Sequence, residues 1–141
     1  MNEADNLARR VAETLLSREG TGPAWGVVID DAREGYALIR MTLRDDMLNG
    51  HRIGHGGMIF ALADTAFAYA CNSRNENTVA QNASISFLSQ AQPGDVLTAE
   101  AREISRSGRS GVYHVSVRTT EGRVIAEFTG LSRTVGGPVI N

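Results

Sequence analysis

The chain has 141 residues, of which 42% are hydrophobic and 21% are charged, and its formal net charge is −2 at pH 7. This length suits one domain over residues 1–141, and the small charge favours neither a nucleic acid nor a membrane as partner. A single cysteine excludes an intrachain disulfide and fits a reducing compartment. The first residues lack the basic and apolar regions of a signal peptide, so we expect a cytoplasmic protein.

The first part of the chain predicts a helix and then a hairpin. Residues 5–17 repeat apolar side chains at helical spacing, and the Gly-Thr-Gly-Pro run at 20–23 ends this helix. Residues 25–31 and 36–43 alternate as strands do, with a glycine-containing turn between them. The polar stretch 44–57 is a long connecting loop, a kind of segment that is often functional.

The stretch from Met58 to Cys71 is apolar at almost every position and contains no proline. It predicts a helix that is apolar all round, and such a helix must be buried on all sides. It is too short to span a membrane. This helix is therefore expected to be the centre of the fold.

The rest of the chain predicts four consecutive antiparallel strands, at residues 78–90, 96–104, 111–119 and 123–135. A turn at 105–109 separates the second of them from the third. A sheet wrapped around the central helix is the simplest arrangement of these elements. Because such a sheet retains open edges, we expect the chain to associate with itself.

Asp64 lies within the apolar helix, and buried carboxylates are rare unless they are paired or functional. Its neighbour Thr65 points about 100° away on a helix and is a poor partner. The alternative is a structural role, in which another hydroxyl or a backbone group donates a hydrogen bond to the Asp64 carboxylate. We favour the functional interpretation, in which the environment tunes Asp64 as a base or a nucleophile.

Gly56 and Gly57 precede this helix, where free backbone amides and the helix dipole favour an oxyanion. The alternative is that the glycines only shape a turn. Gly56 and Asp64 are eight residues apart, which is roughly 12 Å along one helix axis. A base and an oxyanion donor must both lie about 3 Å from the reacting group. If both residues act, the site must combine Asp64 of one subunit with Gly56 of another.

Other reactive side chains give weaker signals. His51 and His55 are four residues apart, but no third ligand is evident, so we expect no metal. Cys71 ends the apolar helix and is interpreted as packed rather than nucleophilic. Arginines such as Arg109 and Arg133 are either solvated charges or phosphate ligands.

The segment from Asn49 to Asn72 resembles the motif of the hotdog-fold acyl-CoA thioesterases, specifically the phenylacetic-acid-degradation subfamily. It contains Asn49, His-Gly-Gly at 55–57, Leu-Ala-Asp-Thr at 62–65 and Ala-Phe-Ala-Tyr-Ala-Cys-Asn at 66–72. The resemblance implies an α+β hotdog fold, with an antiparallel sheet of five or six strands wrapped around a central buried helix. It also implies an extra N-terminal helix.

The resemblance further implies hydrolysis of phenylacetyl-CoA or hydroxyphenylacetyl-CoA to the free acid and CoA. Asp64 would be nucleophile or general base, and the Gly56 amide would polarise the thioester carbonyl across a subunit interface. Asn49 would place the attacking water or the carbonyl, and His55 would support the loop. Further residues implied at the substrate are Thr65, Gly57, Phe60, Arg109, Ser110 and Gly111. No cofactor is implied, since coenzyme A is part of the substrate, and the assembly implied is a homotetramer built from dimers.

Two other classes stay open as alternatives. Hotdog hydratases and dehydratases that act on acyl-CoA carry a His-containing signature, which is absent here. Non-catalytic acyl-CoA sensors lack the catalytic acid and usually carry a DNA-binding segment. Asp64 is present, and the helix predicted at 5–17 is not a helix-turn-helix, so both observations favour the enzyme.

Overall fold

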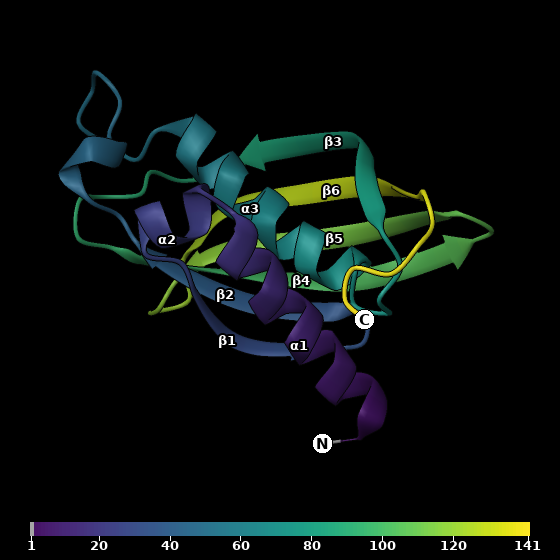
Figure 1. The fold of residues 1–141 in the computed structure, drawn as a ribbon. Helices are drawn as coiled ribbons and strands as arrows, with labels where there is room; N and C mark the ends of the chain where they lie inside the picture. The colour runs from purple at the N-terminus through teal and green to yellow at the C-terminus, as the bar shows by residue number, and fades with distance from the viewer. Residues whose placement is uncertain (1) are drawn as a thin grey trace.

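The computed structural model describes residues 2–141, and residue 1 of the predicted single domain lies outside them. The elements in chain order are α1 (Glu3–Arg18), α2 (Thr21–Trp25), β1 (Val28–Arg33), β2 (Tyr36–Thr42), the 3₁₀ turn η1 (Asp45–Met47), α3 (Gly56–Cys71), β3 (Thr78–Phe87), β4 (Val96–Ser107), β5 (Ser110–Thr119) and β6 (Val124–Thr134). The strands form one antiparallel sheet in the order β1-β2-β4-β5-β6-β3 (Figure 1). The predicted sheet around a central helix is thus confirmed, with six strands and an N-terminal helix.

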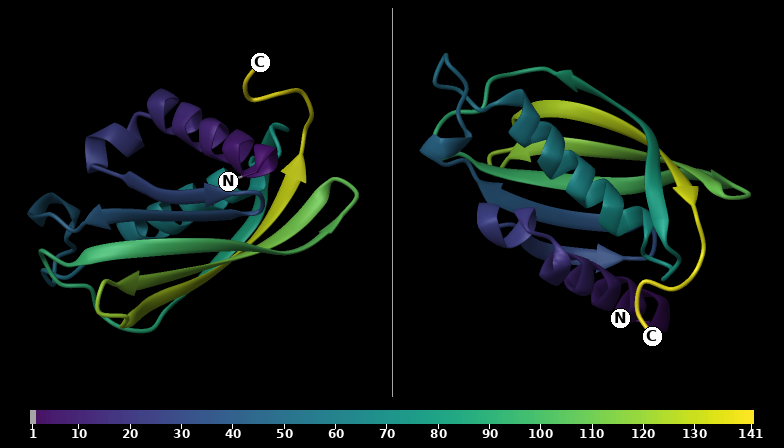
Figure 2. Two further views of the ribbon diagram at one scale, coloured as in Figure 1. Left: turned by 90° about the horizontal axis from the view of Figure 1, so that it is seen from below. Right: turned by 45° about the horizontal axis from the view of Figure 1, so that its top comes forward.

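Both long helices lie on the concave side of the sheet. Figure 2 shows α3 within the curve of the sheet and α1 beside it, over the β1 edge. The amphipathic pattern of α1 places Ala8, Val11 and Ala12 in this interface, where all three are buried. No helix among residues 2–141 is long and apolar enough to cross a membrane.

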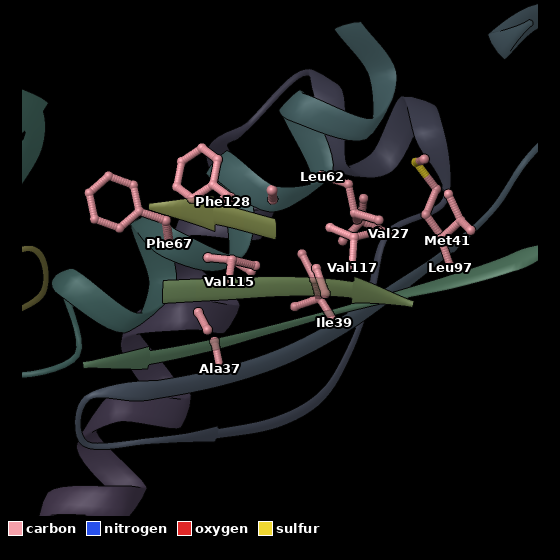
Figure 3. Close-up of a cluster of buried hydrophobic side chains, with 14 of the residues drawn as sticks. Val27, Ala37, Ile39, Met41, Leu62, Phe67, Leu97, Val115, Val117 and Phe128 are labelled. Atoms are coloured by element: carbon pink, nitrogen blue, oxygen red, sulfur yellow. The ribbon is translucent and has the colours of Figure 1, made fainter. Parts of the chain in front are cut away.

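Aromatic side chains hold α3 against the sheet. The ring centroid of Phe67 on α3 lies 5.6 Å from that of Tyr113 and 5.7 Å from that of Phe128, and Figure 3 shows Phe67 and Phe128 close together. Phe60 adds an edge contact to Phe128 at 5.4 Å. The sheet approaches so closely at Gly130 that a Cβ there would lie 2.7 Å from the Phe67 ring. Glycine at position 130 therefore permits the contact between helix and sheet.

The helix α3 is not covered on all sides, so that prediction is wrong for the single chain. Gly57, Ala61, Asp64 and Ala68 follow helical spacing along one face, and each is half-buried or exposed. The sheet covers the opposite face of the helix, where Ile59, Leu62, Ala63, Ala66, Phe67 and Ala70 are buried. We refer to Gly57, Ala61, Asp64 and Ala68 as the open stripe of α3.

Strand β3 is a second uncovered element. It pairs with β6 alone, and most of its side chains are exposed. It contains neither a charged residue nor a proline, the devices that usually protect an open sheet edge. The uncovered side of β3 and the open stripe of α3 therefore both indicate association with another chain.

Several boundaries differ from the prediction. The first strand begins at Val28 rather than Trp25, because residues 21–25 form the short helix α2, which ends at Gly26 with φ of 69°. The turn predicted at 105–109 is shorter, since β4 continues to Ser107 and β5 begins at Ser110. The long loop contains the 3₁₀ turn η1, and α3 begins within the predicted loop, at Gly56.

Gly130→Ala is expected to lower the free energy of unfolding by about 1–3 kcal/mol, because a Cβ there would lie 2.7 Å from the buried Phe67 ring, so the ring or the strand must shift. Urea denaturation followed by circular dichroism measures the change. Gly20→Ala is the control, since nothing lies within 4 Å of a Cβ at that position. Its effect should stay within about 0.5 kcal/mol. Equal stability of the two variants would contradict the close contact at Gly130.

Candidate functional site

The N-terminus of α3 leaves one backbone amide free. His55 is the N-cap residue, and its Nδ1 accepts a hydrogen bond of 2.8 Å from the Gly57 amide. The His55 carbonyl accepts from the amides of Met58 and Ile59 at 3.0 and 3.2 Å. Within residues 2–141 the Gly56 amide has no hydrogen-bond acceptor. The cap therefore leaves Gly56 as the one unpaired donor in this first turn, at the positive end of the helix dipole.

Asn49 supplies a second donor beside Gly56. Its Oδ1 accepts hydrogen bonds from the amides of His51 at 2.9 Å and Ile53 at 3.3 Å, which closes the loop before α3. Its Nδ2 group has no partner in the part of the chain that the structure describes. Asn49 and Gly56 line one open cavity of about 340 Å³. Two N–H donors are therefore available at this cavity, and donors of this kind stabilise a developing oxyanion.

Asp64 lies half-buried near the middle of α3 and receives no hydrogen bond from residues 2–141. Burial raises its pKa above the ordinary value of 3.8. It lines a separate cavity of about 180 Å³ together with Phe67, Cys71 and Thr78. A half-buried carboxylate without a hydrogen-bond donor is poorly solvated, and this makes it a stronger base than an exposed aspartate.

The two cavities belong to opposite ends of α3. Gly56 lines the cavity at the N-terminal end and Asp64 lines the cavity nearer the C-terminal end, and they share no lining residue. Because both residues belong to one continuous helix, a single chain does not bring the amide and the carboxylate together.

Other residues expected at the substrate have local roles within the chain. The Thr65 hydroxyl donates 2.7 Å to the Ala61 carbonyl and does not contact Asp64. The Gly57 amide is occupied by the His55 cap. Phe60 packs against Phe128 and lines neither cavity.

The residues expected near the CoA nucleotide do not line either cavity. Arg109, Ser110 and Gly111 belong to the hairpin between β4 and β5 and line neither cavity. Gly111 is required there by close packing, since a Cβ would lie 2.9 Å from the Tyr113 ring and 3.0 Å from the Ser132 hydroxyl.

One contributor, Phe87, escaped the sequence analysis, and Cys71 was identified there as a packed residue but not as part of a cavity. Phe87 ends β3, and its ring lies 3.2 Å from the position that a Cβ on Gly56 would take. The only signal in the sequence was an apolar Phe87-Leu88 pair ending a largely polar strand, and both side chains prove to be exposed. Cys71 lines the Asp64 cavity, and burial raises the pKa of its thiol to about 12. The thiol is therefore protonated at neutral pH, as expected for a packed rather than a nucleophilic cysteine.

The chain shares this architecture with known proteins. Residues 51–126 match the thioesterase superfamily. The chain is 39% identical over 128 residues to the acyl-coenzyme A thioesterase PaaI of Escherichia coli strain K12, and the match covers 91% of each chain. The solved structure of the E. coli PaaI protein from the phenylacetic acid degradation operon is 38% identical and covers 96% of this chain, with 99% of that chain matched and a TM-score of 0.94.

A second solved structure is also similar to this chain in sequence and fold. The phenylacetic acid degradation protein PaaI from Thermus thermophilus, solved as a mutant, is 32% identical with a TM-score of 0.80, and the match covers 83% of this chain and 100% of that one. Fold and site thus define a thioester hydrolase with the hotdog fold. The chain belongs to the thioesterase superfamily, and the resemblance noted in its sequence is confirmed.

Asp64→Asn is expected to raise the thermal unfolding midpoint at about pH 7.5, because the amide does not carry the charge that burial disfavours. Because burial raises the pKa of Asp64, the folded chain binds this proton more tightly than the unfolded chain does. The stabilisation from the carboxyl is therefore present below its ordinary pKa of 3.8 and lost as pH rises through the raised pKa. The advantage of the variant should shrink towards about pH 4, as measured by scanning fluorimetry.

Asp46→Asn is the control for this experiment. Asp46 is exposed, and a hydrogen bond from Arg44 lowers the pKa of its carboxyl, so its neutralisation should give no gain near neutral pH. An equal gain for both variants, or a gain at position 64 that does not depend on pH, would contradict the assigned environment of Asp64.

Proposed function

We propose that this protein hydrolyses acyl-CoA thioesters to the free acid and CoA. The observation that carries the proposal is the unpaired Gly56 amide, which lines one cavity with the free Nδ2 group of Asn49. These donors suit the oxygen of a thioester carbonyl, which gains negative charge as the carbonyl carbon is attacked. The activity in the name of the E. coli relative supports the same reaction.

The active site is proposed to form between two subunits. The open stripe of α3 is built from Gly57, Ala61 and Ala68 around Asp64, and such small residues let two helices approach closely. The uncharged open edge of β3 favours pairing with another β3. Association about a two-fold axis perpendicular to α3 places the two α3 helices antiparallel, so that Asp64 of one subunit approaches Gly56 of the other.

Asp64 then acts in one of two ways. As a general base it removes a proton from water, which attacks the carbonyl carbon and expels the CoA thiolate. As a nucleophile it attacks the carbonyl carbon directly and expels the CoA thiolate, and water then hydrolyses the resulting mixed anhydride to the free acid and the aspartate. Either route uses the raised basicity of Asp64 and the donors of Gly56 and Asn49, and coenzyme A enters only as part of the substrate.

The acyl group is proposed to occupy the cavity beside Asp64. That cavity has a volume of about 180 Å³ and is lined largely by apolar groups, including Phe67, Ala68 and Cys71. An apolar cavity of about 150 Å³ is sufficient for benzene, so the ring of a phenylacetyl or hydroxyphenylacetyl group fits. A long acyl chain does not fit this volume. The more open cavity at Gly56 would then receive the pantetheine arm.

The remaining proposals concern the nucleotide and the assembly. We propose that Arg109, Ser110 and Gly111 of the hairpin between β4 and β5 lie near the phosphates of CoA, where an arginine suits the anionic charge. The assembly is proposed to be a tetramer built from dimers, in the cytoplasm. The proposed site needs the dimer but not the tetramer, because Asp64 and Gly56 come together between the two subunits of a dimer.

Mixing two inactive variants tests the shared site. Asp64→Asn and Gly56→Pro should each lower kcat by at least about a hundredfold, since one removes the carboxylate charge and the other the amide donor. Coexpression of the two chains should restore about one quarter of wild-type activity, because half of the dimers are mixed and each mixed dimer holds one intact site of two.

Gly56→Ala is the matched control for Gly56→Pro. It adds a Cβ near the Phe87 ring but keeps the amide, so it should retain more activity than the proline variant. Mixed dimers, identified by mass spectrometry, that recover no activity would show that the two residues do not share a site across subunits.

A substrate panel tests the acyl cavity. The kcat/KM for phenylacetyl-CoA is expected to exceed that for palmitoyl-CoA by about tenfold or more, because the cavity beside Asp64 admits a ring but not a long chain. Acetyl-CoA should fall below phenylacetyl-CoA, since it leaves the cavity unfilled. Measurement under one condition with CoA release as the readout is sufficient. A preference for palmitoyl-CoA would overturn the substrate assignment but leave thioester hydrolysis standing.

A further inference from the structure

The part of the cavity wall at Gly56 that follows β3 belongs to no helix or strand, and neither does the part formed by the loop before α3. The part after β3, which we call the wall segment, is residues 88–91 and carries Leu88, Ser89, Gln90 and Ala91, all of which line the cavity together with Phe87. The backbone amides of Leu88 and Ser89 donate to the Ile125 carbonyl at 2.8 and 3.3 Å, and the chain then leaves the sheet. Within residues 2–141, the rest of the segment is held by one backbone hydrogen bond, from the Gly54 amide to the Ala91 carbonyl, and otherwise by side-chain contacts, of which one is the 2.6 Å bond from the Ser89 hydroxyl to the Val124 carbonyl.

Arg123, just before β6, makes most of those contacts. Its Nη1 donates 2.6 Å to the Gln90 carbonyl and 3.1 Å to the Ser89 hydroxyl. Its Nη2 donates 3.4 Å to Asp95 Oδ2, and the same oxygen accepts from the Gln92 amide at 2.8 Å. One guanidinium thus fixes the wall segment at two points and joins it to the turn beyond.

The wall segment also contacts the loop before α3. The Ala91 carbonyl accepts a 2.7 Å hydrogen bond from the Gly54 amide, next to the capping His55. A Cβ on Gly54 would lie 3.0 Å from the Ala91 Cβ, so the two backbones are in close contact. A displacement of the wall segment therefore changes the width of the cavity between Phe87 and Asn49.

We propose that Arg123 is a positioning residue that fixes the wall of the Gly56 cavity and thereby sets the affinity for the CoA thioester. This inference rests on the proposed function. Gly56, Asn49 and Asp64 make no hydrogen bond with Arg123: Gly56 and Asp64 belong to α3, and Asn49 accepts from amides of its own loop. Loss of Arg123 weakens substrate binding without removing a group that takes part in the chemistry, so KM rises while kcat is kept.

The control is an arginine in a matched ion pair elsewhere. Arg40 bonds Asp30 on the β1–β2 hairpin, and the side chains of Arg40 and Arg123 are 47% and 45% exposed. Exposed ion pairs contribute little to stability, so both Arg123→Met and Arg40→Met should fold normally. A difference in KM between Arg123→Met and Arg40→Met therefore results from where the arginine lies in the fold and not from the loss of an ion pair as such.

The test combines kinetics with hydrogen exchange. For phenylacetyl-CoA, Arg123→Met should raise KM about tenfold with kcat changed less than about twofold, Arg123→Lys should recover part of the loss, and Arg40→Met should behave as wild type. Amide exchange over residues 88–95, followed by mass spectrometry, should quicken in Arg123→Met alone. These readouts separate positioning of the wall from general destabilisation.

Opposite results overturn the inference. Unchanged exchange over the wall segment in Arg123→Met shows that the guanidinium does not hold it. Faster exchange with an unchanged KM shows that the wall does not set affinity, and a fall in kcat at constant KM assigns Arg123 to the chemistry instead. A wild-type protein that hydrolyses no acyl-CoA overturns the proposed function itself, and the exchange result still decides whether Arg123 holds the wall.

Discussion

The packing of α3 against the inner face of a curved sheet is the interaction on which the rest of the structure depends. Phe67 contacts the sheet closely, because Gly130 on β6 lets the strand approach the ring. The same contact places one wall of the cavity beside Asp64, since Phe67 also lines that cavity. Packing and site geometry are therefore linked through one side chain, and the helix face turned away from the sheet is left open.

Hydrogen bonding at the start of α3 complements this packing. Donors left unpaired in a folded protein are uncommon, because each forfeits a hydrogen bond that water would provide. Here His55 Nδ1 and Asn49 Oδ1 accept hydrogen bonds from neighbouring backbone amides. Among the described residues, the Gly56 amide and the Asn49 Nδ2 group are the two donors that remain unpaired beside one cavity. Asp64, in contrast, receives no donor at all within residues 2–141, and burial raises its pKa. The chain thus places unpaired donors at one end of the helix and a poorly solvated carboxylate near its middle.

The sequence predicted the parts of this arrangement that depend on local pattern. The run from Met58 to Cys71 identified the central helix, and strand alternation identified the six strands, because both periodicities reflect which face of an element is buried. The short helix α2 was missed, since Trp25 continues an apolar alternation into Val27. The wall segment was also missed, because its position depends on the register of β3 with β6 and on contacts from Arg123. The sequence of residues 88–91 does not by itself indicate that β6 and Arg123 are its partners.

The order of strands in the sheet also bears on how the chain is made. Strand β3 hydrogen-bonds only to β6, although β4 and β5 lie between them in the sequence. During synthesis β1, β2, β4 and β5 can pair as they emerge, but β3 remains without a partner until β6 has left the ribosome. The uncharged β3 is therefore exposed from its own emergence until that of β6, together with the side of α3 that it later covers. Completion of the sheet is therefore a late event, and the nascent chain is most open to chaperones, or to aggregation, just before β6 emerges.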